Sequence, residues 1–374
     1  MDALPQLSPP DRLLLGPGPS MTAPSVYDAL ARPTVGHLDP YFLQVMDEVR
    51  AMLRAVFRTE NALTVPMSGT GSAGMETCLV NLIEPGARVL VGVNGVFGTR
   101  MCEVARRAGA EVVAVEGEWG RALTPEAFRA AAGATENRRF DLLCVVHAET
   151  STGARTDVAP LREVADELGA LLVVDCVTSL GGIPVELDAW GVDAAYSGTQ
   201  KCLSCPPALS PVSFSPRAEA RLQARKQPVQ SWYLDLTLIA SYWGTERAYH
   251  HTAPINMIYG LHESLRLILE EGLEARWQRH EANSRAFWDG LAELGLELAA
   301  PEAERLVPLT SIRVPDGVDE GAVRAHLLKE HGIEIGGGLG PLKGKVWRVG
   351  LMGAGSSPEN VARCLAGLKD ALGR

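Results

Sequence analysis

Apolar and polar positions change their spacing several times along the chain, and each change predicts a new element. Between residues 41 and 57 apolar side chains recur every three or four positions, which predicts an amphipathic helix. After it, short apolar runs alternate with helical patterns as far as residue 200. The runs predict strands near residues 88–93, 111–115, 141–146, 171–175 and 193–196, separated by helices near 75–83, 124–132 and 157–168.

This order of elements favours an α/β fold in which helices cover both faces of a mostly parallel sheet. Ligands of such sheets bind at the carboxyl ends of the strands. Polar residues that directly follow strands are therefore the first candidates for a functional site.

The pattern changes near residue 273, where a long amphipathic helix is expected to run to residue 294. Beyond it we predict a smaller α+β domain with strands near 307–314, 333–335 and 346–349 and helices over 319–331 and from Ser357 onward. Residues 1–20 are rich in proline and glycine and predict an extended arm. We therefore expect an arm over 1–20, a large domain over 21–271 and a small domain over 272–374.

Composition narrows the classes of function. The net charge of −10 argues against a nucleic-acid or anionic-membrane partner. The N-terminus has neither the basic start nor the apolar core of a signal peptide, and no apolar run approaches membrane-spanning length. Seven cysteines lie scattered in apolar segments, which suggests reduced thiols and a cytoplasmic location.

We predict no metal site from sequence spacing. Cys202 and Cys205 form a C-x-x-C pair, but no second pair or flanking histidine completes a zinc set. His250 and His251 are adjacent, and adjacent residues on a strand point to opposite sides, so they make poor joint ligands.

The glycine run at residues 69–74 matches G-x-G-x-x-G and precedes a predicted helix. A dinucleotide site would also need an acid at the end of the next strand to bind the ribose, and that strand ends in Asn94-Gly95. We therefore interpret the run as a phosphate-binding helix start without a ribose site, with a plain tight turn as the alternative.

Lys201 follows a short buried strand and stands among apolar residues and prolines. Poor solvation lowers the pKa of a lysine, which suits an amine that forms a Schiff base with a carbonyl cofactor. Asp175 ends the apolar run 171–174 and would lie at the same sheet edge. A carboxylate at one end of a ring and a lysine at the other is what a pyridoxal-phosphate enzyme requires. The alternatives are a surface lysine and an aspartate that caps a turn.

Several motifs together resemble the alanine-glyoxylate and serine-pyruvate aminotransferases, which belong to the class V group of fold-type I pyridoxal-phosphate enzymes. The resemblance runs nearly from end to end. It is carried by residues 68–71, 94–98, 147–153, 174–177, 197–201, 249–254, 336–340 and 345–350.

The resemblance implies a role for each of several residues. Lys201 would bind the aldehyde of pyridoxal 5'-phosphate (PLP) and Asp175 would pair with its ring nitrogen. The remaining cofactor contacts implied are Val177 on one ring face, Phe97 at the ring-stacking position, Thr150 at the phenolic oxygen, and Thr70, Gly71, Ser72 and Gln200 at the phosphate. Phe97 stands where tryptophan is usual in mammalian members, and Ser72 where histidine is often found.

The resemblance also implies a homodimer, because Tyr249 and Thr252 would reach the phosphate in the opposite subunit. Arg348 would bind the substrate α-carboxylate from the small domain, so that substrate would lie in a cleft between domains. From alternation alone, Arg348 could instead lie on the wet face of a strand. Gly36, beside His37, would help to shape a pocket for small side chains, together with Trp232 and Tyr233.

The activity implied is transfer of the amino group of a small L-amino acid, alanine or serine, to a small 2-oxo acid, glyoxylate or pyruvate, by a ping-pong mechanism. One alternative is a class V lyase of the cysteine desulfurase type, which would need a cysteine on a mobile loop. Others are a 2-aminoethylphosphonate-pyruvate aminotransferase and a binding protein without catalysis.

Overall fold

A seven-stranded sheet organises most of the chain in the computed structural model, which describes residues 6–374. The strand order is β2-β10-β9-β8-β5-β3-β4, and β10 is antiparallel to both neighbours while all other neighbouring pairs are parallel. The predicted α/β class with a mostly parallel sheet is confirmed. The strands are β2 (Leu63–Ser68), β3 (Arg88–Val93), β4 (Glu111–Glu116), β5 (Leu142–Val146), β8 (Leu171–Asp175), β9 (Ala194–Tyr196) and β10 (Leu209–Phe214).

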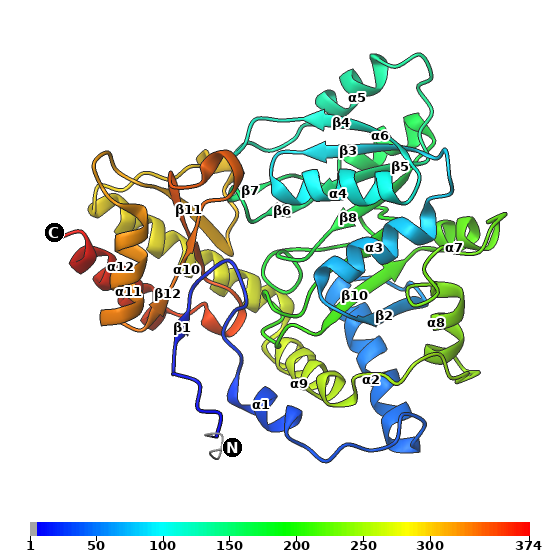
Figure 1. Ribbon diagram of the computed structural model, residues 1–374, viewed down its shortest axis with the longest axis horizontal. Helices are drawn as coiled ribbons and strands as arrows, with labels where there is room; N and C mark the ends of the chain where they lie inside the picture. Colours follow the sequence, from blue (N-terminus) through cyan, green and yellow to red (C-terminus); the bar gives the residue numbers. More distant parts are fainter. Residues whose placement is uncertain (1–5) are drawn as a thin grey trace, which may run out of the picture.

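The inner strands β5, β8 and β9 are buried along their whole length, as expected for parallel strands covered on both faces. Helices pack around the sheet, with α3 and α4 in front of it in Figure 1. These helices are α1 (Pro24–Leu30), α2 (Pro40–Phe57), α3 (Gly71–Leu82), α4 (Val96–Arg107), α5 (Pro125–Gly133), α6 (Leu161–Leu168), α7 (Pro216–Gln223), α8 (Leu236–Trp243) and α9 (Ile255–Glu271).

Two helices begin at positions other than those predicted. α3 starts at Gly71 and so includes the end of the glycine run. Gly74 allows α3 to pack closely against β10, because a side chain there would collide with Ser210. α6 starts at Leu161 rather than at 157, since Pro160 precedes its first turn. Strands β2 and β10 and helices α1, α4, α7, α8 and α9 were not predicted from the sequence.

The C-terminal part forms a separate small unit around a three-stranded sheet in the order β11-β14-β13. It has its own apolar core, in which Phe287 and Trp347 are fully buried. The domain boundary between residues 271 and 272 stays a prediction. The elements of the small unit are α10 (Leu273–Glu293), β11 (Leu309–Arg313), α11 (Glu320–Glu330), β12 (Ile333–Glu334), β13 (Gly336–Gly337), β14 (Val346–Gly350) and α12 (Pro358–Ala371).

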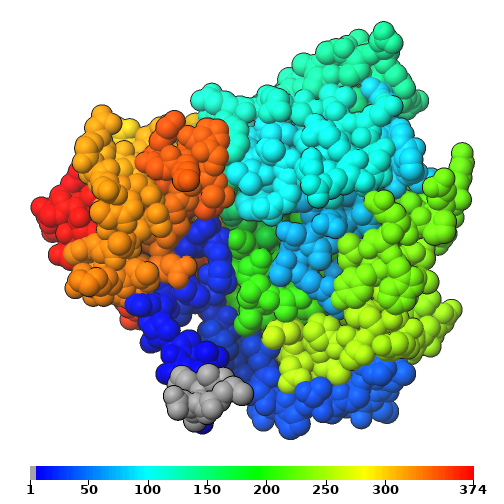
Figure 2. Space-filling view, in the orientation of Figure 1, coloured from blue at the N-terminus to red at the C-terminus, as the bar shows by residue number. Residues whose placement is uncertain are grey.

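The N-terminal arm lies between the two units. Strand β1 (Leu13–Leu14) pairs with β12 in parallel, and Leu15 accepts a backbone hydrogen bond from Gly350. Figure 2 shows this dark blue segment between the orange small unit and the green part of the large one. Residues 1–5 of the predicted arm fall outside the described residues. Within residues 6–374, none of the helices combines the length and the apolar character that crossing a membrane requires.

Candidate active site

A cavity of about 220 Å³ lies where β8 and β9 end and α3 begins. The structure brings most of the predicted site residues together here. Those that line the cavity are Thr70, Gly71, Ser72, Phe97, Thr150, Asp175, Val177, Gln200 and Lys201. A larger cavity of about 630 Å³ between α1, α2 and α9 shares no lining residue with it.

The start of α3 provides an anion-binding end to the cavity. Thr70 is the N-cap residue, but its side chain does not cap the first turn within the described part of the chain. The Ala73 N–H donates to the Thr70 carbonyl at 2.7 Å, and the N–H groups of Gly71 and Ser72, with the positive end of the helix dipole, are left for an anion in the cavity. Oε1 of Gln200 is buried there and has no partner among residues 6–374. Gly71 and Gly198 approach so closely that a Cβ on Gly198 would lie 3.3 Å from Cα of Gly71.

Lys201 lies at the other side of this cavity under the N-terminal arm. Its side chain is buried, and this burial, followed by the positive charge of Arg348, lowers the pKa of the amine to about 8. Nζ donates a hydrogen bond to the carbonyl of Pro17, and Ser20 Oγ donates to the carbonyl of Lys201 at 2.6 Å. Gly18 has a φ of +109°, and a Cβ there would lie 2.5 Å from Nζ. Only glycine allows the arm to approach the amine so closely.

Asp175 is held by two hydrogen bonds at the end of β8. The Val177 N–H donates to Oδ1 at 2.8 Å, and the Tyr196 hydroxyl donates to Oδ2 at 2.7 Å. Burial raises the pKa of Asp175 to about 6, while these two hydrogen bonds favour its ionised form. A cation beside the carboxylate would favour ionisation further. The site thus offers a fixed carboxylate to a protonated ring nitrogen.

Arg348 connects the small unit to the cavity. It lies on β14, between Ser311 of β11 and Gly336 of β13, and is buried rather than on a wet strand face. Its Nε donates to the Gly337 carbonyl at 2.7 Å and its Nη1 donates to the Thr150 carbonyl at 3.1 Å. Burial lowers the pKa of the guanidinium, whose charge Glu149 partly balances. The arginine is therefore fixed across the boundary between the two units.

Sequence reasoning missed Glu149, although it lies inside a motif used for the resemblance. This fully buried carboxyl accepts hydrogen bonds from the N–H (3.0 Å) and Oγ (2.6 Å) of Ser151 and from the Phe97 N–H (3.1 Å). Burial raises its pKa. Glu149 thereby fixes the first turn of α4 and the Phe97 ring at the cavity.

Tyr196 and Arg100 are among the further lining residues that sequence reasoning missed. The guanidinium of Arg100 lies 5.0 Å from the centre of the Phe97 ring, and its Nη1 donates to Ser72 Oγ at 3.3 Å. Its position one helical turn after Phe97 was the available signal, because residues three apart on a helix share a face.

Four predicted site residues do not line the cavity of this chain. Arg348 contacts the lining residue Thr150 from beside the cavity, and the other three lie apart from it. Gly36, Tyr249 and Thr252 lie on the surface, where the Tyr249 hydroxyl is 3.3 Å from Thr252 Oγ1. The ring of His37, next to Gly36, lies 4.9 Å from that of Tyr249. Their roles stay predictions, and each would require a second subunit.

Comparison with known proteins places this geometry among well-described relatives. A family model described as aminotransferase class-V matches residues 19–345. An alanine–glyoxylate aminotransferase of Drosophila melanogaster is 41% identical over 368 residues, which cover 97% of this chain and 93% of that protein. An (S)-ureidoglycine–glyoxylate transaminase of Bacillus subtilis is 37% identical over 385 residues, covering 98% and 92%. The crystal structure of an alanine–glyoxylate aminotransferase from Nostoc sp. has a TM-score of 0.97 and 52% identity, covering 99% of this chain and 97% of that one.

Proposed function

Because the chain belongs to the class-V aminotransferase family, whose members act with PLP, we propose that it transfers the amino group of L-alanine to glyoxylate. The observation that carries this proposal is the cavity, in which a buried lysine, a fixed carboxylate and an uncapped helix start converge below Arg348. Both kinds of relative named above use glyoxylate according to their names, whereas their amino donors differ. The acceptor is thus better supported than the donor.

The residues present fit PLP. The start of α3 with Gln200 suits the phosphate, Asp175 suits a protonated ring nitrogen, and Lys201 has an amine of lowered pKa. Val177 and Phe97 line the same cavity and provide apolar surfaces for a flat ring.

Bound PLP would supply a carbonyl carbon that can take up the substrate amine and a ring that can draw electrons away from the α-carbon. Side chains of the protein bind the substrate carboxylate, move the α-proton and keep Asp175 ionised. Arg348 binds the α-carboxylate with a planar pair of donors, and its Nη2 has no partner within residues 6–374. The Lys201 amine would take the proton from the substrate α-carbon and deliver it to the cofactor carbon that keeps the amino group, and a pKa of about 8 suits this transfer near neutral pH. Tyr196 holds Asp175 in its ionised form.

Replacing Tyr196 with phenylalanine should weaken PLP binding and shift its pH dependence upward. A hydrogen bond to a charged group contributes about 1.5–3 kcal/mol, so the pKa of Asp175 should rise by one unit or more. The Asp175 carboxylate loses its charge as pH falls through its pKa. As pH is lowered, the variant should therefore lose PLP affinity at a higher pH than the wild type. Titration of the PLP-free protein from pH 5 to 8 should show affinity at least about tenfold weaker near pH 6.

The matched control for this variant is Tyr259→Phe. Tyr259 is a buried tyrosine on α9 whose ring packs against Phe42, away from the cavity. Its replacement should leave PLP affinity unchanged at every pH. Equal pH profiles for Tyr196→Phe and the wild type would refute the role given to the Tyr196 hydroxyl.

The amino donor distinguishes an alanine–glyoxylate aminotransferase from related aminotransferases. Serine, aminoethylphosphonate and (S)-ureidoglycine are the other donors to test, the last because of the ureidoglycine relative.

A cysteine desulfurase activity is disfavoured, since Cys364 and the other six cysteines are all buried. Burial also raises the pKa of the Cys364 thiol to about 12, which leaves too little thiolate for a nucleophile.

Purified enzyme with L-alanine and glyoxylate should form glycine and pyruvate in equal amounts. Amino transfer should proceed by ping-pong kinetics, with parallel lines in double-reciprocal plots. A kcat/KM for serine or (S)-ureidoglycine more than about tenfold above that for alanine would replace the proposed donor. Sulfide released from L-cysteine would favour the lyase alternative.

We further propose that the active unit is a homodimer. Large apolar side chains lie exposed on three segments whose rings contact one another, and a monomer rarely exposes so many together. They are Leu38 (44% exposed), Trp232 (60%), Tyr233 (43%) and Tyr249 (59%). Tyr249, Thr252 and Gly36 belong to these segments, which supports their predicted reach into the site of the other subunit.

Mixing two inactive variants tests this arrangement. Lys201→Ala removes the amine of its own site, and Tyr249→Ala removes a contact that would belong to the opposite site. In a mixed dimer, one site would then hold both wild-type residues, so activity should rise from near zero toward a quarter of the wild-type value. A mixture that stays inactive although mixed dimers form would contradict the contribution in trans, and a monomeric mass would contradict the dimer.

We also propose a cytoplasmic location. The support is that all seven cysteines are buried as free thiols in apolar surroundings, which suits a reducing compartment. Cell fractionation tests it directly, with the enzyme expected in the cytosolic fraction and its recovery in another compartment as the contrary result.

A further inference from the structure

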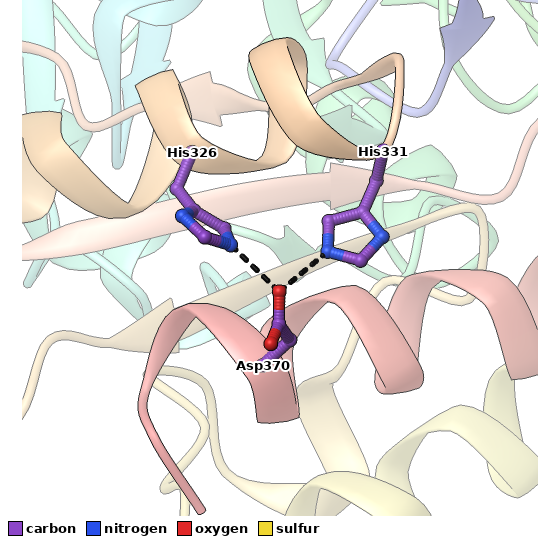
Figure 3. A group of neighbouring side chains, drawn as sticks. All are labelled: His326, His331 and Asp370. Carbon is purple, nitrogen blue, oxygen red and sulfur yellow. Dashed lines mark hydrogen bonds and ion pairs between the residues drawn. The ribbon is translucent and has the colours of Figure 1, made fainter.

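On the small unit, two histidines and an aspartate from neighbouring helices converge on one point (Figure 3). His326 lies on α11, His331 is the C-cap residue of that helix, and Asp370 lies on α12. Nε2 of His326 and Nε2 of His331 lie 2.7 and 2.9 Å from the same atom, Oδ2 of Asp370. We call these three residues the α11–α12 cluster. It shares no residue with the cofactor cavity.

We propose that the α11–α12 cluster binds one divalent transition-metal ion and that Zn²⁺ suits it best. Two imidazole nitrogens and a carboxylate oxygen are donors that Zn²⁺ commonly uses. All three ligand atoms lie within 4.8 Å of one another. Tetrahedral Zn²⁺ with bonds of about 2.0–2.1 Å holds its ligands about 3.4 Å apart. The two histidine nitrogens would each have to move roughly half an ångström farther from Asp370 Oδ2 to accept the ion, and water would complete the coordination.

Buried contacts fix the backbones that carry the three side chains. Leu327 of α11 and Leu368 of α12 are fully buried in the core of the small unit. Gly367 lets the two helices approach closely, because a Cβ there would lie 2.7 Å from Leu327 Cδ2 and 3.5 Å from His331 Cγ. The ligand positions are therefore set by packing and do not depend on the ion.

The three side chains remain accessible to an ion from solvent. Their exposed fractions are 38% for His326, 30% for His331 and 58% for Asp370. Oδ2 of Asp370 lies within hydrogen-bond distance of both histidines, so the three ligand atoms already face one point. The nearby Glu330 is paired with Lys329 at 2.7 Å, which offsets its charge.

The position of the α11–α12 cluster indicates a structural role for the ion. The residue after His331, Gly332, accepts a hydrogen bond from the Leu13 N–H at 2.9 Å, where the N-terminal arm joins β12. The same arm continues to Pro17, whose carbonyl accepts from Lys201. An ion at the cluster would join α11 to α12 beside this attachment. It should stabilise the small unit and leave amino transfer unchanged.

Calorimetric titration of chelator-treated holoenzyme with ZnCl₂ should show one ion per chain, with a Kd on the order of 1 μM. At about 100 times Kd, Tm should rise by about 2–4 °C, and EDTA should reverse the rise. MgCl₂ at the same concentration should produce no shift, because Mg²⁺ prefers oxygen ligands. Wild-type protein that binds no Zn²⁺ would overturn the proposal and leave the cluster as a hydrogen-bonded clamp.

Two variants test whether the Zn²⁺ ion binds at the α11–α12 cluster. Asp370→Asn and His326→Gln each remove one donor from an exposed position, and each should weaken Zn²⁺ binding by at least about tenfold. The matched control is His262→Gln, because His262 pairs with Glu48 at 2.7 Å and no second histidine among residues 6–374 pairs with that carboxylate. The control should bind Zn²⁺ as the wild type does. Unchanged affinity in Asp370→Asn, or loss of the ion in His262→Gln, would place the ion elsewhere and contradict the proposal.

Discussion

Replacement of Lys201 by alanine should abolish turnover and the yellow absorbance of the bound cofactor. The variant loses both the amine that binds the cofactor and the base that moves the α-proton, and the base alone contributes about 10²–10⁴-fold. We therefore expect kcat to fall by about 10³-fold or more. Stopped assays with L-alanine and glyoxylate, together with the absorbance spectrum after dialysis, measure both effects.

Two further variants make this test specific. Lys201→Arg keeps a positive charge but cannot form the covalent bond, and it should be as inactive as Lys201→Ala. Lys226→Ala removes an exposed lysine outside the cavity and should behave as the wild type. A Lys201→Ala protein that stays yellow after dialysis and still transaminates would refute the assignment.

Replacement of Arg348 by lysine should lower kcat/KM for alanine and for glyoxylate by about 10²-fold each. Both substrates carry the carboxylate that Arg348 would bind, and a charged hydrogen bond contributes about 1.5–3 kcal/mol that a lysine cannot reproduce in the same planar geometry. The effect should appear mainly in KM. PLP absorbance should persist, since Arg348 does not line the cofactor cavity.

Arg313→Lys on the neighbouring strand β11 is the control for this loss. Arg313 is exposed at the end of that strand, so its replacement should leave both KM values unchanged. If Arg348→Lys instead lost PLP absorbance and thermal stability together, its hydrogen bonds to Gly337 and Thr150 would be its main contribution, and the carboxylate role would be wrong.

Helices and strands were predicted well where a buried face gives the apolar residues a regular spacing. The strand at 88–93 and the helix at 41–57 appear as β3 and α2 with bounds almost unchanged, because each has uninterrupted apolar spacing. Strands β2 and β10 were missed. They pair Pro66 with Pro211, and proline inside a run usually argues against a strand.

The site could be predicted as far as its residues follow strands or start helices. Asp175, Lys201 and the glycine run all lie at one sheet edge, so topology alone brings them together. The contact between Pro17 and Lys201 joins residues 184 positions apart, and no local pattern indicates it. The same holds for Arg348, because the central strand β14 is buried along its whole length and alternation does not apply there.

The N-terminal arm and Arg348 each connect the small unit to the cofactor cavity. The arm pairs with the small unit at β12 and covers the Lys201 amine, and Arg348 reaches from the same unit to Thr150. Both link the small unit to the cofactor cavity from opposite ends of the sequence. A change in how the two units pack would therefore alter the amine and the carboxylate-binding arginine together.

The most direct test of the central claim is chemical. Holoenzyme reduced with borohydride should retain the cofactor irreversibly, and mass spectrometry of its peptides should find the pyridoxyl mass on the fragment that contains Lys201 and on no other. A modified fragment from another part of the chain, or an unmodified Lys201 fragment after full reconstitution with PLP, would contradict the account.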